Sequence, residues 1–467
     1  MSNTPPITED FRSETEIEEN PFRLSDEEIK EVTEAIRAQD ADTVHAVIEE
    51  LNPADTAELI EKFAEEDRRE LLDMYSDQLS PATFSELDPE LRRQALMNMQ
   101  AADVAGIISE LESDDALDII EDLDEDFQKQ IIHKLSSKTR LALEEGLSFP
   151  EDSAGRLMQR EVVAVPEFWS VGKTIDYLRN MAEELPDDFF DIIVVSPSYH
   201  VTGEIPLNRI ICARRDVKLT DLKLDDAHPI PAEMDQEDVA DIFRRDNILS
   251  APVVDENGRL LGIITIDDII DVIDEEAHED IMKMAGVEHG DLYRAVLSTT
   301  TTRFRWLFVN LLTAILASAV ISFFDATIEQ IVALAVLMPI VASMGGNAGT
   351  QALTVAVRSL ATKEVSDANK WRIIGKESLV GTFNGILFAL LAGLATAIWF
   401  GSPMLGIVIA LAMVINLVVA GACGAAIPIL LQRAGADPAV ASAVVLTTVT
   451  DVVGFFAFLG LAAMMLL

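Results

Sequence analysis

The sequence predicts a multi-domain membrane protein that combines an all-α superhelical array, two α/β units, a connecting helix and a five-helix transmembrane domain. Three observations predict it: a twelve-residue period in residues 51–146, a β-α-β-β-α pattern that occurs twice, and five long apolar stretches after residue 303. The expected boundaries are 1–21 for a disordered tail, 22–150 for the array, 151–220 and 221–280 for the α/β units, 281–302 for the connecting helix, and 303–467 for the membrane domain.

Charge divides the chain into two very different parts. The 467 residues include 35 basic and 80 acidic ones, a net charge of −45, although 49% are hydrophobic. Residues 303–467 contain eight basic and seven acidic residues, so residues 1–302 hold the other 27 and 73, a net charge of −46. So acidic a region repels phosphate, which excludes nucleic acid as a partner.

Several classes of function and location are disfavoured by what the sequence lacks. Cys212 and Cys423 are the only cysteines, too few for a disulfide framework or a Cys-rich metal site, as in a reducing cytosol. No apolar signal segment occupies the N-terminal twenty residues. No nucleophile–base pair in a suitable context and no P-loop occurs, so we expect neither an enzyme nor an ATP-driven pump.

The twelve-residue period runs from Leu51 to Gly146. Position 1 of each line of twelve is Leu, Met, Phe or Tyr, and positions 9 and 10 are mostly apolar. Helix-starting Pro, Ser or Asp recurs near positions 3 and 4. The period predicts one short helix and a turn per repeat, stacked with an acidic outer face. Only the third line, 75–86, fits badly, and a plain helical bundle is the alternative.

The two α/β units follow from alternating strand-like and helical segments. Expected strands are 162–165, 191–195, 251–255 and 261–265, and expected helices are 171–184, 236–245 and 267–274. Residues 250–269 (SAPVVDENGRLLGIITIDDI) resemble the end of a CBS domain, a module that usually senses a small ligand. Thr265 and Asp268 match its adenosine-ribose signature, whereas Pro206 breaks the match in the first unit. Binding of a nucleotide such as ATP is therefore left open.

The five apolar stretches cover about 303–324, 328–357, 378–400, 404–431 and 438–467, each long enough to cross a bilayer. Basic residues cluster before the first stretch, in the second connection and in the fourth. The positive-inside rule then places the N-terminus in the cytoplasm and the C-terminus outside, in the cell (inner) membrane. The acidic region is therefore expected to be cytoplasmic.

Asp451 is the only acidic residue well inside an apolar stretch. A carboxylate within the bilayer marks an ion or proton pathway by default. Thr hydroxyls surround it, and we expect the Gly-rich segment 345–351 to expose carbonyl oxygens; such oxygen ligands suit Mg²⁺, Ca²⁺ or Mn²⁺. A symmetric dimer would bring two Asp451 together, enough to hold a hydrated divalent ion. The alternative is a neutral Asp451 hydrogen-bonded to a neighbouring helix.

Three motifs and the order of the domains resemble one family, the MgtE magnesium channels, from about residue 22 to the end. The motifs are PEDSAGRLM (150–158), PIVASMGGNAGTQ (339–351) and GADPAVASAVVLTTVTDVVG (435–454). The resemblance implies a homodimer around one pore, in which Asp451 of each chain binds hydrated Mg²⁺. It also implies that backbone oxygens near Ser343, Gly346 and Thr447 help to bind or orient the waters of the ion, with Asn347 as a further pore residue.

The same resemblance implies regulatory Mg²⁺ sites among cytoplasmic carboxylates. The matching residues are Asp235, Glu237, Asp268, Asp271, Glu276, Glu279 and Asp280. Independently, carboxylates between residues 267 and 279 recur at helical spacings, so they repel one another until a cation screens them. Asn247 and Thr350 depart from the family pattern, and a merely solvated acidic surface is the alternative.

We therefore expect a Mg²⁺-selective channel that its own ion closes, because Mg²⁺ binds the closed state more tightly than the open one. Two alternatives come from other classes of protein. One is a proton-coupled carrier of Mg²⁺, Mn²⁺ or Co²⁺, in which Asp451 carries the proton. The other is a membrane-anchored CBS sensor that conducts no ions.

Overall fold

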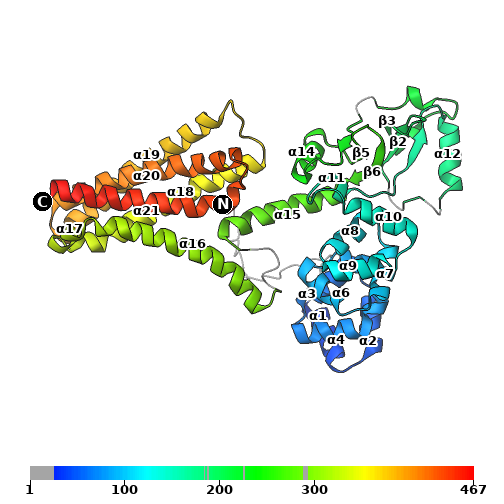
Figure 1. Ribbon diagram of the computed structural model, residues 1–467, viewed down its shortest axis with the longest axis horizontal. Coiled ribbons are helices and arrows are strands. Elements are labelled where there is room, and N and C mark those ends of the chain that lie inside the picture. The colour runs from blue at the N-terminus through cyan, green and yellow to red at the C-terminus, as the bar shows by residue number, and fades with distance from the viewer. Residues whose placement is uncertain (1–25, 183–184, 187–188, 225–226, 288–292) are drawn as a thin grey trace, which may run out of the picture. The chain divides into compact units, whose positions relative to one another are not determined.

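The computed structural model describes residues 26–182, 185–186, 189–224, 227–287 and 293–467, so the predicted tail 1–21 lies outside the described residues. The chain forms two compact units, one ending at Asp268 and the other comprising Ile269–Leu467. Figure 1 shows the elements of both units.

The first unit begins with the helical array. Its elements are α1 (Asp26–Arg37), α2 (Ala41–Ile48), α3 (Pro53–Lys62), α4 (Glu65–Tyr75), the 3₁₀ turn η1 (Ser76–Gln78), α5 (Pro81–Ser85), α6 (Pro89–Met97), α7 (Ala101–Glu110), α8 (Ser113–Glu121), α9 (Glu125–Ile132) and α10 (Ser137–Gly146). All of α3, α4 and α6–α10 begin at the third position of a twelve-residue line. The third line instead holds η1 and α5. The repeat is therefore confirmed, together with its one irregular line.

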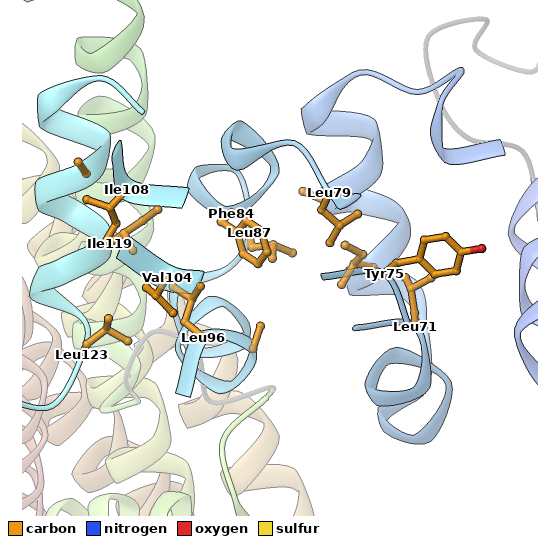
Figure 2. Close-up of a cluster of buried hydrophobic side chains, with 14 of the residues drawn as sticks. Leu71, Tyr75, Leu79, Phe84, Leu87, Leu96, Val104, Ile108, Ile119 and Leu123 are labelled. Carbon is orange, nitrogen blue, oxygen red and sulfur yellow. The ribbon is translucent and has the colours of Figure 1, made fainter. Parts of the chain in front are cut away.

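The apolar residues at the first position of the twelve-residue repeats hold the array together. Phe63, Tyr75, Leu87, Leu123 and Leu135 are each 3–4% exposed and belong to one continuous apolar core. Figure 2 shows part of this core, where side chains from successive helices meet. Burial of each such side chain contributes about 1.5–3 kcal/mol. The array is thus a stable scaffold for the acidic residues on its surface.

Two α/β units complete the first compact unit, each with a three-stranded sheet. After the short α11 (Ala154–Leu157), the first contains β1 (Ala164–Pro166), α12 (Val171–Asn180), β2 (Asp191–Val195), β3 (Val201–Pro206), α13 (Leu207–Cys212) and η2 (Leu219–Asp221). The second contains β4 (Ile230–Pro231), α14 (Gln236–Asp246), β5 (Ser250–Val254), β6 (Leu260–Thr265) and the start of α15 (Ile266–Ala285), a helix that continues into the second compact unit after Asp268. In both, the first strand is parallel to the second and the second is antiparallel to the third. The repeated β-α-β-β-α pattern is confirmed.

The connecting segment differs from the single helix expected for 281–302. Helix α15 continues without interruption from the second α/β unit to Ala285, so the boundary predicted at 280 falls inside it. Gly286 ends α15 with φ +71°, a conformation that suits glycine. The last part of the expected helix belongs instead to α16, which begins at Val296.

The second compact unit contains five helices long and apolar enough to cross a membrane, as the sequence predicts. They are α16 (Val296–Ser322), α18 (Ala333–Ala361), α19 (Lys370–Phe400), α20 (Pro403–Arg433) and α21 (Pro438–Met465), with the short α17 (Asp325–Gln330) after α16. Helices α18, α19 and α21 all pack against α20 (Figure 1). Helix α20 is the most buried of the five, which makes it the centre of the unit.

Glycines allow these helices to approach closely. A Cβ at Gly393 of α19 would lie 2.9 Å from the carbonyl oxygen of Gly406 in α20. A Cβ at Gly424 of α20 would lie 2.6 Å from the carbonyl oxygen of Gly349 in α18. Small residues serve the same purpose in membrane helices generally, where close backbone packing replaces the hydrophobic driving force.

Candidate functional site

Helix α18 carries a polar face that the rest of its chain leaves exposed. Ser343, Asn347 and Thr350 are exposed and lie at positions i, i+4 and i+7, which places them on one side of the helix. Gly346 adjoins this face, and a Cβ built there would meet nothing within 4 Å. Polar side chains in a membrane-spanning helix face water or protein and avoid lipid. This face therefore needs a neighbour other than lipid.

The Gly-rich segment of α18 differs from the expectation that it exposes its carbonyl oxygens. Helix α18 runs unbroken through 345–351, so these carbonyl groups accept helical hydrogen bonds. The carbonyl oxygen of Gly346 also accepts a hydrogen bond from Thr350 Oγ1 at 3.0 Å. The glycines provide space, since Gly345 contacts Asn416 and Gly349 contacts Leu446. What the segment offers an ion is therefore hydroxyl and amide groups on an open face.

Helix α21 packs beside α18 and carries Asp451. The Asp451 side chain is half-buried, and exposed Thr447 lies one turn before it. Thr447 Oγ1 donates to the carbonyl oxygen of Ala443 at 3.0 Å, which leaves its lone pairs available. Among the described residues, no hydrogen bond or ion pair reaches the Asp451 carboxylate. The alternative of a hydrogen bond to a neighbouring helix is thus not observed within the described part of the chain.

Asn416, absent from the predicted site residues, joins the helices behind this region. It is fully buried, and its Nδ2 donates to the carbonyl oxygen of Val341 at 2.9 Å. Its Oδ1 lacks a hydrogen-bond partner within the described part of the chain. Gly345 and Gly454 both contact the Asn416 amide, so this one side chain fixes α18 and α21 against α20.

A second group of carboxylates lies where the helical array meets the α/β units, inside the first compact unit. Asp114, only 9% exposed, lies in the first turn of α8, and Asp268 lies in the first turn of α15. Burial raises the pKa of Asp114 well above its usual value, and the Asp268 and Asp115 carboxylates raise it further. Burial likewise raises the pKa of Asp268 to about 6, against hydrogen bonds donated by the Thr265 hydroxyl and backbone N–H. The two domains therefore meet across carboxyl groups that resist ionisation.

Positive and neutral groups hold the same contact together. Ser113 Oγ donates to Glu161 Oε2 at 2.7 Å, and the backbone N–H of Arg160 donates to Ser113 Oγ at 2.7 Å. Arg160 pairs with Glu145 at 3.0 Å, and Arg156 pairs with Glu121 at 2.5 Å. The arginine pairs hold the domains together, whereas the buried Asp114 and Asp268 carboxyl groups oppose the contact.

The other predicted regulatory residues occupy separate places. Asp235 caps α14 by accepting the N–H of Glu237 at 3.0 Å, so both lie at the start of that helix. Asp271 and Glu276 lie along α15, and Glu279 and Asp280 lie in its last turns. Within the described ranges, no three His, Cys, Asp or Glu side chains come close enough to hold a metal ion. The structure thus brings Asp268 to the helical array but does not gather the full predicted set.

Asp114, Asp115 and Glu161 are site residues that the sequence did not reveal. The run Glu112–Ser113–Asp114–Asp115 has the composition of an ordinary helix start, where acidic residues are common. Only the packing of α8 against the α/β units makes Asp114 buried. The raised pKa values make a pH test of this contact possible.

Neutralising Asp268 is expected to stabilise the full-length protein near pH 7.5, in detergent with Mg²⁺ chelated. The pKa of Asp268 in the folded protein, about 6, lies above the ordinary aspartate value of 3.8. Between these two pH values the folded state therefore binds more protons than the unfolded state. Stability therefore falls as pH rises through that window. Asp268→Asn should raise the unfolding temperature by about 2–4 °C at pH 7.5, as roughly 1 kcal/mol does in a domain of this size.

At pH 4 the same substitution should have little effect, because Asp268 is then protonated in the folded state. Circular dichroism melts at the two pH values measure the difference. Asp103→Asn, an exposed carboxylate in the first turn of α7, is the control and should leave both melts unchanged. An Asp268→Asn protein less stable than wild type at pH 7.5 would contradict the unfavourable burial of this carboxylate.

Comparisons with known proteins agree with this architecture. The family model MgtE, described as a divalent cation transporter, matches residues 338–461. The MgtE intracellular N domain model matches residues 51–152, and the CBS domain model matches residues 219–275, the second α/β unit with the start of α15.

Curated relatives extend the likeness along most of the chain. The magnesium transporter MgtE of Bacillus subtilis is 30% identical over 89% of this chain and 92% of its own length. The magnesium transporter MgtE of Thermus thermophilus is 31% identical over 93% of this chain and 97% of its own length. The crystal structure of the cytosolic domain of the Mg²⁺ channel MgtE in complex with ATP is 28% identical, covering 52% of this chain and 99% of its own, with a TM-score of 0.49. The chain belongs to the MgtE family.

Proposed function

We propose that this protein is a homodimeric, Mg²⁺-selective channel that admits magnesium to the cell and that cytoplasmic Mg²⁺ closes. One observation carries the proposal: Asp451 is an unpaired carboxylate, among the described residues, on a membrane helix that packs beside the exposed polar face of α18. Relatives over most of the chain are named magnesium transporters, which supports Mg²⁺ as the transported ion.

A dimer gives these groups a function that one chain cannot. Mg²⁺ releases its waters reluctantly, so it is bound through one or two carboxylates and retained water. Two Asp451 side chains on a shared axis would supply the charge. The hydroxyls of Ser343 and Thr447, the amide of Asn347 and the open space beside Gly346 would accommodate the hydrated ion. The same arrangement removes the polar face of α18 from lipid.

The acidic contact between the array and the α/β units supports the proposed gate. Burial first, and repulsion from neighbouring carboxylates second, raise the pKa values of Asp114 and Asp268, and a divalent cation near them would offset both effects. Mg²⁺ would then favour the joined, closed arrangement, and its loss would favour separation and opening. We propose the remaining carboxylates as further ligands of the closed state: Asp235, Glu237, Asp271, Glu276, Glu279 and Asp280.

Orientation and a second ligand complete the proposal. Basic residues in alternate connections support a cytoplasmic N-terminus and an outside C-terminus in the cell (inner) membrane. Thr265 and Asp268, joined by a 2.8 Å hydrogen bond at the end of β6, support a site for the ribose of a nucleotide such as ATP. Asp268 would then be common to the nucleotide and the acidic contact.

Single-channel recording of the purified full-length protein tests the function. We expect discrete Mg²⁺ currents whose open probability falls as cytoplasmic Mg²⁺ rises, with Ca²⁺ and Mn²⁺ substituted in turn to measure selectivity. Mg²⁺ flux driven by a pH gradient at zero voltage, without discrete openings, would indicate a proton-coupled carrier and overturn the channel. Absence of any divalent flux would favour a non-conducting sensor.

A further inference from the structure

The last turn of α15 contacts three membrane helices, all inside the second compact unit. Lys283 pairs with Asp437, which precedes α21, at 3.0 Å between Nζ and Oδ2. Met284 packs against an apolar cluster formed by α18 and α21, which includes Leu353 and Leu446. Gly286 lies so close to Trp306 of α16 that a Cβ there would overlap the indole ring. This turn is therefore attached to the membrane helices by one ionic contact and two packing contacts.

Lys283 lies among carboxylates. Its Nζ is also 2.6 Å from Glu279 Oε1 on the previous turn of α15. Asp280 lies close enough for Asp437 to affect it: burial first, and the Asp437 charge second, raise the pKa of Asp280 to about 6. Burial opposes the charge on Lys283, but the Glu279 and Asp437 contacts outweigh it and raise the pKa of Lys283, so its ammonium group stays charged. One fixed cation thus partly neutralises the carboxyl groups of Glu279, Asp280 and Asp437.

Asp437 links this cluster to α21, the helix that carries Asp451. Its Oδ1 accepts the N–H of Ala439 at 2.7 Å and so caps α21, while its Oδ2 contacts Lys283. Asp451 lies fourteen residues further along the same helix, about 21 Å at 1.5 Å per residue. A displacement of the capped end of α21 would therefore be carried along the helix to Thr447 and Asp451.

We propose that the Lys283 ammonium group holds the last turn of α15 against the capped end of α21, the helix that carries Asp451, and so sets the Mg²⁺ concentration at which the channel closes. We call the Lys283–Asp437 contact the latch. The proposal rests on the proposed function, because it concerns the same gate. Without the Lys283 ammonium, the Glu279, Asp280 and Asp437 carboxylates would repel one another. More Mg²⁺ would then be needed to bring α15 and α21 together. Lys283 acts as a positioning residue and does not touch the ion in the pore.

The latch is tested by measuring Mg²⁺ flux through the full-length protein in liposomes while the Mg²⁺ concentration on the cytoplasmic side of the protein is varied. Lys283→Met is expected to raise the Mg²⁺ concentration that closes half of the channels about fivefold. This change corresponds to the upper end of the free energy that a partly exposed ion pair contributes. Its flux at low Mg²⁺ should match wild type, and Lys283→Arg, which keeps the charge, should restore wild-type closing. Lys62→Met is the matched control, because its 2.7 Å pair with Glu58 has the same i, i+4 spacing but lies within α3.

A double-mutant cycle with Asp437→Asn isolates the contact, since Asn caps helices as well as Asp does. Both single variants should shift closing, and the double variant should shift it no further than the larger single one. Unchanged closing in Lys283→Met, or fully additive shifts, would overturn the latch while leaving Mg²⁺ closure of wild type intact. If the flux of wild type did not depend on Mg²⁺, the proposed gate itself would fail. Unfolding temperatures of the same single and double variants would then decide whether the Lys283–Asp437 contact exists.

Discussion

Asp451→Ala is expected to lower Mg²⁺ flux by about a hundredfold or more, the largest loss from any single substitution in this chain. In a dimer the change removes two carboxylates from one axis. At an effective dielectric constant of 20, two opposite unit charges 4 Å apart attract each other with about 4 kcal/mol, and Mg²⁺ carries two charges. Even a fraction of that energy exceeds the roughly 2.7 kcal/mol that a hundredfold change requires. Uptake by liposomes containing a Mg²⁺-sensitive dye measures it.

Two further variants separate charge from shape. Asp451→Asn keeps the size and hydrogen-bonding groups of the side chain, so it should be nearly as inactive as Asp451→Ala if charge holds the ion. Asp325→Asn neutralises an exposed carboxylate at the start of α17 and should conduct like wild type. Flux in Asp451→Asn close to wild type would contradict an electrostatic role and leave the pore assignment without its main support.

The signal for Asp451 was visible in the sequence because a lone carboxylate contrasts with the apolar run around it. The twelve-residue period was equally accessible, since each repeat carries its own helix start and its own core residue. Even the irregular third line could be predicted, and the structure has η1 and α5 there. Both features depend on local pattern, which a single sequence carries in full.

Features that depend on packing between distant segments could not be predicted. Asp114 resembles every other acidic residue near a helix start until α8 meets the α/β units and buries it. The segment 345–351 suggested exposed backbone, yet helices satisfy their own hydrogen bonds in lipid, and glycine simply lets Asn416 approach. The predicted connecting helix was misplaced because α15 continues past the second unit until Gly286. The partners of Asp451 stay a prediction, because the proposed dimer would supply them from a second chain.

Removing the first compact unit is expected to remove most of the closure by Mg²⁺ while preserving conduction. A chain beginning at Ile269 keeps the whole second unit, including the Lys283–Asp437 contact and Asp451. It loses the helical array, both α/β units and the Asp114–Asp268 contact. The ratio of flux at low and high cytoplasmic Mg²⁺, expected to be about tenfold or more in the full chain, should fall to about twofold, because only the carboxylates near Lys283 remain to bind the ion. Liposome flux on both proteins measures the two ratios.

This outcome follows from where the charge lies. Residues 1–302 carry a net charge of −46 and residues 303–467 carry +1, so the truncation removes most of the groups that a cytoplasmic cation could neutralise. Flux of the truncated protein must still vanish with Asp451→Ala, which shows that it uses the same pathway. If the truncated chain closed at the same Mg²⁺ concentration as the full chain, the gate would reside in the membrane unit. The acidic domains would then be solvated surface, since an ion that binds them equally in both states shifts no equilibrium.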